Sequence, residues 1–349
     1  MEDVRGTLDA VAAERRIPSL SLCVVVDGVE RFHHTVGAAR TVPRRDARAD
    51  QAYDLASVTK ALAGATVIAS LVEEGRFDLE TPVARWFPEV DARAVVRHLL
   101  LHASGWPAWR PFYAEVQGAW GTASARDQVL RAIRAVPMET EPGTRHVYSD
   151  LGFMTLMAIA EAETDQSFDA LFRERIQEPS GIADLRWGWP TAAATELCPI
   201  RDILIEGTVH DLNCASLGGV SAHAGLFGNA RAVAGLADAL RQAVAGERTD
   251  LPGRTLREMW ATAGPGSHRG GWDSPSDGYT STGRWFPQDS RGHLGYTGTS
   301  VWVVPSRRTT VALLTNRVHP VDDKEPIRAA RPRIHDAVAR ALGWDTGSV

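Results

Sequence analysis

The feature that most constrains the fold of this chain is that β-rich runs lie near both of its ends. Ser19–Val26 is an apolar run closed by a turn at Gly28, and Glu30–Val36 follows as a return strand. Near the other end, Thr299–Val304 and Thr309–Thr315 are separated by a short turn that begins at a proline. Two such hairpins predict a single antiparallel sheet that is built from both chain ends.

Between the two hairpins the apolar residues recur with helical spacing. The expected helices are 58–74, 95–101, 125–135, 151–163, 168–176 and 230–245, with two more at 3–15 and 325–342. We therefore expect an α+β fold, with flanking helices on the antiparallel sheet and an inserted, mostly helical lobe. The expected organisation is one unit over 1–349, with an α/β lobe at about 1–60 and 230–349 and a helical lobe at about 61–229. Gly264–Gly283, rich in Gly, Ser, Pro and Asp, is expected to be a long surface or active-site loop.

The bulk composition excludes several classes of protein. With 349 residues, 44% hydrophobic and 23% charged, the chain can bury a large core. The formal net charge of -5 and the lack of a basic stripe argue against nucleic acid and membrane surfaces as partners. Three cysteines without CxxC spacing indicate neither a disulfide framework nor a zinc site. The charged start of the chain lacks the apolar run of a secretory signal, so we expect a cytoplasmic protein.

The first candidate for chemistry is the pair Ser57 and Lys60. Ser57 stands where a short β-like segment gives way to a helix, near free backbone N–H groups, and Lys60 lies one turn further along the same helix face. The flanking residues are apolar on nearly all sides, which predicts a buried lysine able to assist deprotonation of a serine. The alternative is that Ser57 is only a helix cap and Lys60 is a surface residue.

Two further segments carry candidate site residues. Tyr148 and Asp150 are two apart in an extended stretch, so both side chains can face one cleft, and a lysine nearby can lower the pKa of a tyrosine. The alternative is a core tyrosine beside a helix cap. His293-Leu294-Gly295-Tyr296 begins a glycine-rich run before a strand, where exposed N–H groups can stabilise an oxyanion. The alternative is a bulged strand with a surface histidine.

Taken together, these three motifs resemble the penicillin-recognising serine hydrolases, in particular the class C β-lactamases and the lactamase-like esterases. The family pattern is SxxK, then Y-x-N, then K-T-G or H-T-G. His98–Gly105 is similar to the family's HLLTHTSG segment, and the blocks around His210–Asn213 and His223–Phe227 resemble one branch of these hydrolases. The resemblance covers roughly residues 5–340.

The resemblance implies roles for individual residues. Ser57 would be the acylated nucleophile, and Lys60 and Tyr148 would share the general acid and base work. The N–H groups of Ser57 and Tyr296 would form the oxyanion hole. His293 would stand in the place of the Lys or His of the third motif, with Gly295 as its glycine.

The chain departs from the family pattern at two positions. Asp150 replaces the usual Asn, which implies a protonated Lys60 and a larger share of the base role for Tyr148. It also removes an amide that family members use to bind substrate amides. Leu294 replaces the usual Thr, whose hydroxyl helps to hold a β-lactam or peptide carboxylate. Both changes leave acyl-ester chemistry possible.

Metal chemistry is not expected. His210, Asp211 and His223 are ligand types, but their spacing is loose, and His98 and His102 lack the Glu that an HExxH zinc motif requires. No cofactor is expected either. The eleven tryptophans are expected in the core by default, although several fall in loop-like stretches and could line an acyl pocket.

The expected function is therefore that of a serine hydrolase acting through an acyl-enzyme on Ser57. The expected substrates are carboxylic esters or amides, with hydrolysis of a carboxylic ester as the first choice. The alternatives are an acyltransferase in a biosynthetic pathway, a D-amino-peptidase or β-lactamase, and a catalytically silent binding protein on the same fold. The sequence does not indicate an oligomeric state.

Overall fold

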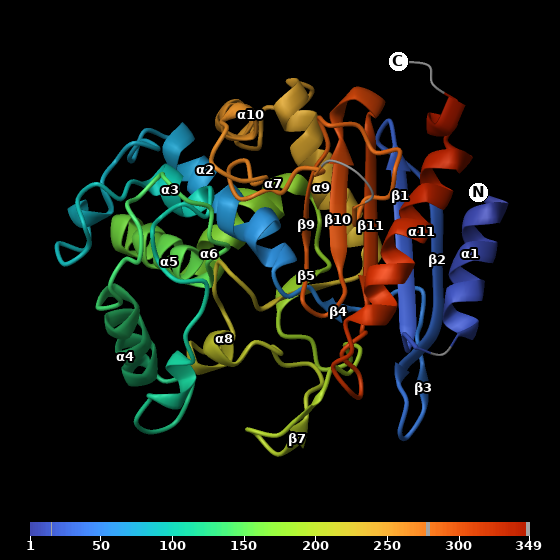
Figure 1. Cartoon of the computed structure of the whole chain (residues 1–349), viewed down its shortest axis with the longest axis horizontal. Coiled ribbons are helices and arrows are strands. Elements are labelled where there is room, and N and C mark those ends of the chain that lie inside the picture. Colours follow the sequence, from blue (N-terminus) through green and yellow to red (C-terminus); the bar gives the residue numbers. More distant parts are fainter. Residues whose placement is uncertain (15, 277–279, 347–349) are drawn as a thin grey trace.

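The main sheet of the computed structural model confirms the prediction of a sheet built from both chain ends. The structure describes residues 1–14, 16–276 and 280–346. Six antiparallel strands lie in the order β3-β2-β1-β11-β10-β9, and Leu22 of the first hairpin stands opposite Leu313 of the second (Figure 1). Their bounds are β1 Ser19–Val26, β2 Val29–Arg40, β3 Arg45–Asp46, β9 Arg291–Leu294, β10 Ser300–Val304 and β11 Thr309–Thr315.

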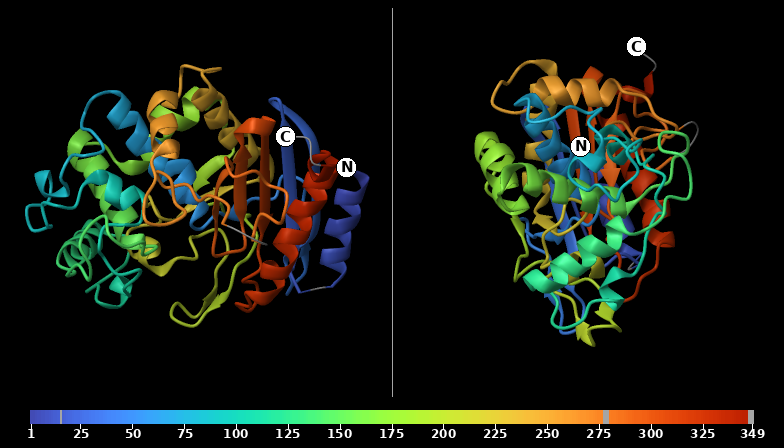
Figure 2. Two further views of the ribbon diagram at one scale, coloured as in Figure 1. Left: turned by 45° about the horizontal axis from the view of Figure 1, so that its top comes forward. Right: turned by 90° about the vertical axis from the view of Figure 1, so that its left-hand side faces the viewer.

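Helices cover both faces of this sheet, as the alternation of its side chains requires. Helices α1 (Glu2–Ala13) and α11 (Glu325–Ala341) lie side by side on one face, where they pack against Leu22 and Leu313 (Figures 1 and 2). Helix α9 (Ala230–Ala245) packs on the other face. Its start is fixed by Asn229, whose side chain accepts a 2.9 Å hydrogen bond from the amide of Ala232.

The segment between the two halves of the sheet is mostly helical. The remaining α-helices are α2 Thr66–Glu73, α3 Val96–Leu100, α4 Ala123–Arg134, α5 Asp150–Thr164, α6 Phe168–Phe172, α7 Glu178–Ser180, α8 Leu212–Ser216 and α10 Gly253–Ala261. The helix expected over 58–74 begins with π-helical turns at Lys60–Ala65, and the helix expected over 168–176 ends in π-helical turns at Arg173–Gln177. Helices α7, α8 and α10 were not expected from the sequence. Short 3-10 turns occur at Val83–Arg85, Phe112–Ala114, Pro305–Arg307 and Trp344–Thr346.

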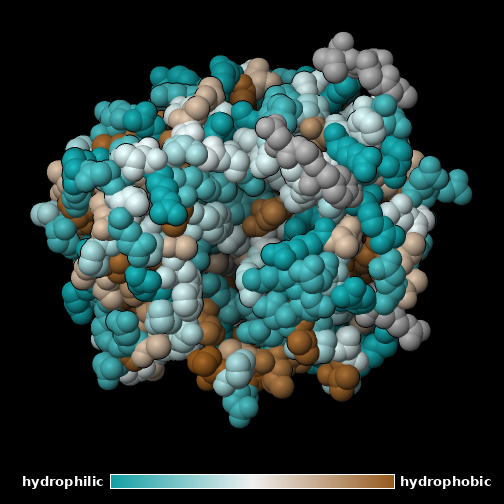
Figure 3. Space-filling model, viewed as in Figure 1, coloured by the Kyte–Doolittle hydropathy of each residue, from teal (hydrophilic) through white to brown (hydrophobic). Residues whose placement is uncertain are grey.

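A second, small sheet carries the segment that leads to Ser57. Its order is β4-β8-β5, with bounds β4 Tyr53–Asp54, β8 Leu226–Gly228 and β5 Leu185–Trp187. Strand β4 confirms the short β-like segment expected before Ser57. A separate hairpin pairs β6 Leu197–Cys198 with β7 Ile203–Leu204. The hairpin exposes Leu197 and Ile203. Strand β7 lies at the lower edge of the molecule in Figure 1, and hydrophobic residues gather along that edge in Figure 3.

Parts of two sequence predictions fall outside the described residues. Residue 15 ends the helix expected over 3–15, and residues 277–279 belong to the loop expected over Gly264–Gly283. The described part of that loop is irregular and is tied to β9 through backbone hydrogen bonds between Asp273 and Gly292. In the described ranges, no helix combines the length and the apolar character needed to cross a membrane.

Candidate active site

Ser57 lies in a turn that is held by Asp54 of β4 and by Thr299, the residue before β10. Ala56, the residue before it, has a left-handed backbone with φ of 46°, which is strained for a residue with a side chain. Its amide donates a 2.8 Å hydrogen bond to the Asp54 carboxylate. The hydroxyl of Thr299 donates to the Leu55 carbonyl oxygen at 2.9 Å. Because residues so far apart in sequence fix this turn, the position of Ser57 depends on the complete fold.

Lys60 lies at the bottom of the site and is fully buried, as the apolar flanks predicted. Its Nζ atom donates to Ser57 Oγ at 3.0 Å and to the carbonyl oxygen of His223 at 3.1 Å. A third contact is an ion pair of 2.6 Å with Asp150 Oδ1. Three oxygen atoms therefore surround an ammonium group that has three protons to donate.

The charges around Lys60 set the protonation of the site. Burial lowers the pKa of Lys60, but the carboxylate of Asp150 more than offsets this, so the pKa lies above its usual value. Burial raises the pKa of Tyr148, and the opposing effect of Lys60 does not overcome it. The expectation that Asp150 keeps Lys60 protonated is thus supported. The lowered pKa considered for Tyr148 is not observed, and the raised pKa favours a neutral phenol that can donate a proton.

Two backbone N–H groups remain available at the site, on Ser57 and on Tyr296, which line the same cavities. The amides of Ser57 and Tyr296 have no hydrogen-bond acceptor among the residues that the structure describes. Gly295, the residue after β9, packs closely against the turn before Ser57, because an added Cβ would lie 2.0 Å from Thr299 Oγ1 and 2.5 Å from the Leu55 carbonyl oxygen. These two amides fit the oxyanion hole that the sequence resemblance implies.

Gly295→Ala is expected to lower kcat/KM by about 100-fold, because the new methyl group must push Tyr296 N–H away from Ser57. Hydrolysis assays on the purified variant would measure this loss. Gly6→Ala, at a helical position with nothing within 4 Å of the added Cβ, serves as the control and is expected to retain native activity. Native activity in Gly295→Ala would show that the Tyr296 amide does not contribute.

Ser57 opens into a cavity of about 430 Å³. Tyr148 and Asp150 both line it, so the prediction that they face one cleft agrees with the structure. Trp109 and Tyr113 supply aromatic walls. The other lining residues are Ala56, Glu196, His210, Asp211, Leu212, Ala224 and Tyr296.

A second cavity of about 340 Å³ is also lined by Ser57 and Tyr148, and its wall is basic. The basic residues that line it are Arg317, Lys324, Arg328 and Arg331. Arg331 is buried and donates to the Gly298 carbonyl oxygen at 2.9 Å, while its Nε atom has no partner within the described ranges. His268 and Asp273 also line this cavity, which places the loop expected over Gly264–Gly283 at the site.

His293 is buried at the end of β9, which excludes a surface histidine at this position. Its Nδ1 atom lies 2.8 Å from the Leu294 carbonyl oxygen and its ring lines the basic cavity. Potential ligand atoms of His102, His268 and His293 lie within 4.8 Å of one another. However, His102 Nδ1 accepts a 3.0 Å hydrogen bond from the Ser149 amide, so the neutral ring carries its proton on Nε2 and has no free lone pair for a metal. This donor set does not suit a metal ion.

Several residues of the site are not identified by the sequence. Asp54 links the amides of Ala56 and His210, and Asp211 and His223 line or support the larger cavity. The sequence indicates the block at His210–His223 as similar to one branch of these hydrolases and as a weak metal candidate, but it assigns no role to Asp211 or His223. Of the tryptophans, Trp109 lines the cavity, whereas Trp106 and Trp272 are buried in the core.

Comparison with known proteins identifies the family and the fold of this chain. The family model described as Beta-lactamase matches residues 4–333. The chain belongs to the beta-lactamase family. One relative is a putative D-alanyl-D-alanine carboxypeptidase of Escherichia coli (strain K12), 29% identical over 351 residues, which cover 88% of this chain and 80% of that protein.

Solved structures share the fold. EstCE1, a hydrolase with promiscuous acyltransferase activity, superposes with a TM-score of 0.78 at 20% identity and 97% coverage of both chains. D-amino acid amidase from Ochrobactrum anthropi SV3 superposes with a TM-score of 0.73 at 24% identity, covering 99% of this chain and 98% of that chain. The fold of this chain is thus shared with one protein named as a hydrolase with promiscuous acyltransferase activity and with another named as a D-amino acid amidase.

Proposed function

We propose that this protein is a serine hydrolase that cleaves small carboxylic esters or amides through an acyl-enzyme on Ser57. The observation that carries the proposal is the 3.0 Å contact between Lys60 Nζ and Ser57 Oγ, at the edge of a cavity and beside two free backbone N–H groups. A nucleophile, a proton-transfer partner and an oxyanion site are the parts that acyl transfer requires.

The proton of Ser57 leaves through Lys60. Ser57 Oγ forms a bond to the substrate carbonyl carbon, and its hydroxyl proton passes to Lys60 as Lys60 gives one of its protons to Asp150. This route follows from the raised pKa of Lys60, since an ammonium group can accept a proton only while it releases another. The tetrahedral oxyanion is stabilised by the amides of Ser57 and Tyr296.

Tyr148 protonates the leaving group. As the bond from the carbonyl carbon to nitrogen or oxygen breaks, the neutral phenol donates its proton to the leaving atom and regains one from the Lys60–Asp150 pair. Lys60 Nζ lies 5.1 Å from the centre of the Tyr148 ring, so the two groups are close enough to exchange protons through the Ser57 hydroxyl or a water molecule. Water then attacks the acyl-enzyme by the reverse sequence.

Tyr148→Phe is expected to lower kcat for an amide by about 100- to 10,000-fold and to change KM little. The loss for a p-nitrophenyl ester is expected to be much smaller, because p-nitrophenolate leaves without a proton. Parallel assays of both substrates would separate the two cases. Tyr53→Phe is the control, since the buried Tyr53 hydroxyl bonds Ser19 Oγ away from the cavity. Equal losses on both substrates would contradict the proton-donor role.

A second candidate is cleavage of an amide whose leaving group carries a carboxylate, as in a carboxypeptidase. The basic wall made by Arg317, Lys324, Arg328 and Arg331 favours it, because an anion in that cavity would lie next to Ser57. Leu294 in place of the family's Thr argues against it. Two alternatives stay predictions from the sequence. One is acyl transfer to a nucleophile other than water, and the other is ligand binding without turnover.

Intact-mass measurement after exposure to a fluorophosphonate and, separately, to a penicillin tests the proposed function. Labelling of Ser57 by the phosphonate alone supports an esterase or amidase, and labelling by both reagents favours the carboxypeptidase or β-lactamase candidate. If neither reagent labels Ser57, the protein is a binding protein on a hydrolase fold and the proposal fails.

A further inference from the structure

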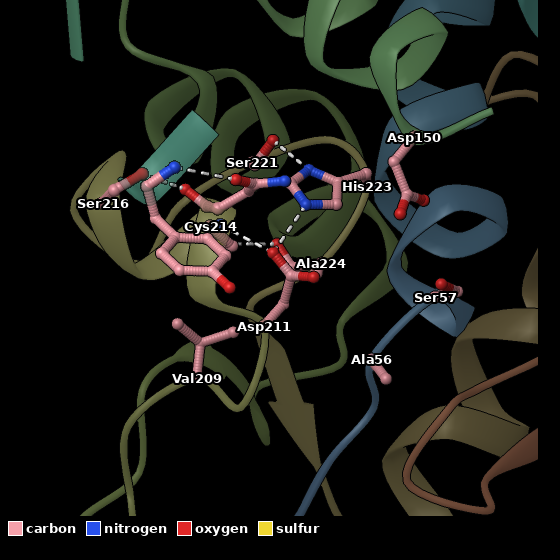
Figure 4. A network of polar contacts seen from close by, with 12 residues as sticks. Ala56, Ser57, Asp150, Val209, Asp211, Cys214, Ser216, Ser221, His223 and Ala224 are labelled. Atoms are coloured by element: carbon pink, nitrogen blue, oxygen red, sulfur yellow. Dashed lines mark hydrogen bonds and ion pairs between the residues drawn. The ribbon is translucent and has the colours of Figure 1, made fainter. Parts of the chain in front are cut away.

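Asp211 is a carboxylate that the fold fixes rigidly in the wall of the larger cavity. It caps α8, where its Oδ1 atom accepts a 2.7 Å hydrogen bond from the Cys214 amide. The same oxygen lies 3.0 Å from His223 Nε2, and His223 Nδ1 lies 2.7 Å from the hydroxyl of Ser221 (Figure 4). Both ring nitrogens of His223 are thus partnered, since Nε2–H donates to Asp211 and Nδ1 shares a hydrogen bond with the Ser221 hydroxyl.

The other oxygen of Asp211 is free to bind substrate. Both contacts of the carboxylate use Oδ1, and Oδ2 has no hydrogen-bond partner in the described part of the chain. The side chain is 26% exposed and lines the same cavity as Ser57. Burial raises the pKa of Asp211, but His223 and the Cys214 amide lower it by more, so the group is a carboxylate at neutral pH.

The two other carboxylates of this cavity already have cationic partners. Asp150 pairs with Lys60 at 2.6 Å. Glu196 lies 3.3 Å from His210 Nε2, and Glu196 and Asp54 outweigh burial to raise the pKa of that histidine. Asp211 differs from these two carboxylates because the contacts of its partners all fall on Oδ1 and leave Oδ2 open, and it lines the larger cavity but not the basic one.

We propose that Asp211 selects substrates whose acyl group carries a free ammonium group, that is, aminoacyl amides or esters. The ammonium donates to Asp211 Oδ2 when the carbonyl carbon lies at Ser57, and the remainder of the acyl group contacts Trp109 and Tyr113. Lys60 does not oppose this binding strongly, because Asp150 balances its charge. The inference rests on the proposed function and adds the class of acyl group that the site accepts.

Three p-nitroanilides with the same leaving group test the inference: alanyl, with an ammonium; lactoyl, with a hydroxyl; and propionyl, with neither. The native protein is expected to prefer alanyl over propionyl in kcat/KM. Asp211→Asn keeps the cap and the contact with His223 but removes the charge. It is expected to lower kcat/KM for the alanyl substrate by about 10- to 100-fold and to leave the other two within about threefold. An equal loss on all three, or no alanyl preference in the native protein, overturns the inference.

Glu196→Gln is the matched control, because Glu196 lines the same cavity but is paired with His210. Glu196→Gln is expected to keep the alanyl preference. If Glu196→Gln loses the preference and Asp211→Asn keeps it, Asp211 is not the residue that binds the ammonium group. With the native protein alone, the preference is expected to decline between about pH 7 and 9 as the substrate ammonium, whose pKa is near 8, loses its proton.

Binding without turnover separates this inference from the proposed function. In Ser57→Ala, millimolar alaninamide of either enantiomer is expected to raise the melting temperature, and propionamide is not. The Ser57→Ala/Asp211→Asn double variant is expected to lose the shift. If the ammonium shift persists in the double variant, the inference is wrong even when hydrolysis at Ser57 is confirmed. If the shift behaves as expected but Ser57 is never acylated, the proposed function alone fails.

Discussion

Ser57→Ala is expected to lower kcat/KM for every hydrolysed substrate by about 100,000-fold, because no acyl-enzyme can form without the Oγ atom. The fold is expected to survive. The turn at Ser57 is held by the Ala56 amide, the Asp54 carboxylate and Thr299, none of which uses the serine side chain. Steady-state kinetics on esters and amides would measure the loss, and a fluorophosphonate is expected to add no mass to the variant.

Ser70→Ala is the matched control for this experiment. Ser70 is buried on α2 and donates to the Val67 carbonyl oxygen, away from both cavities. The control is expected to show native kinetics and native labelling. Hydrolysis at the native rate by Ser57→Ala would exclude an acyl-enzyme on Ser57. Labelling of that variant at another serine would show that the other serine is the nucleophile.

The sheet could be predicted because its strands are local patterns. The runs of β1, β10 and β11 are apolar and bounded by turns, so each hairpin can be recognised within about twenty residues. The two hairpins are expected to pair with each other in one sheet, because an unpaired edge strand leaves its backbone N–H and C=O groups without partners. The π-helical start at Lys60–Ala65 could not be predicted, since hydrophobic spacing does not distinguish it from an α-helix.

The part of the site that could be predicted is the part whose residues lie close together in the sequence. Ser57 and Lys60 are one turn apart, so their contact follows from helix geometry. The support for Ser57 comes instead from Asp54 and Thr299, which meet only when the two chain ends form the sheet. The free oxygen of Asp211 depends on the positions of Cys214 and His223, which no spacing rule supplies.

Asp150 in place of the family's Asn changes the electrostatics of proton transfer. An amide at this position cannot hold a proton, whereas a carboxylate 2.6 Å from Lys60 Nζ can receive one. The same carboxylate keeps the buried lysine charged in the resting protein, which an apolar environment alone would not do. The pair therefore combines two functions, since it neutralises a buried charge and accepts the Ser57 proton. A variant experiment can separate them.

Lys60→Met is expected to lower kcat/KM by about 1,000- to 10,000-fold and the free energy of unfolding by roughly 3 kcal/mol. The first loss follows from removal of the group that contacts Ser57 Oγ. The second follows because Asp150 is left without its cationic partner in a largely buried position. Kinetics and urea denaturation on the same preparation would measure both effects.

The double variant Lys60→Met/Asp150→Asn decides whether Lys60 takes part in catalysis or only balances a charge. Removing both charges is expected to restore most of the lost stability, because replacing both members of a buried ion pair costs little. Activity is expected to stay as low as in Lys60→Met, since no group remains to accept the Ser57 proton. If activity returned together with stability, Lys60 would act only as a counterion of Asp150, and another group would have to deprotonate Ser57.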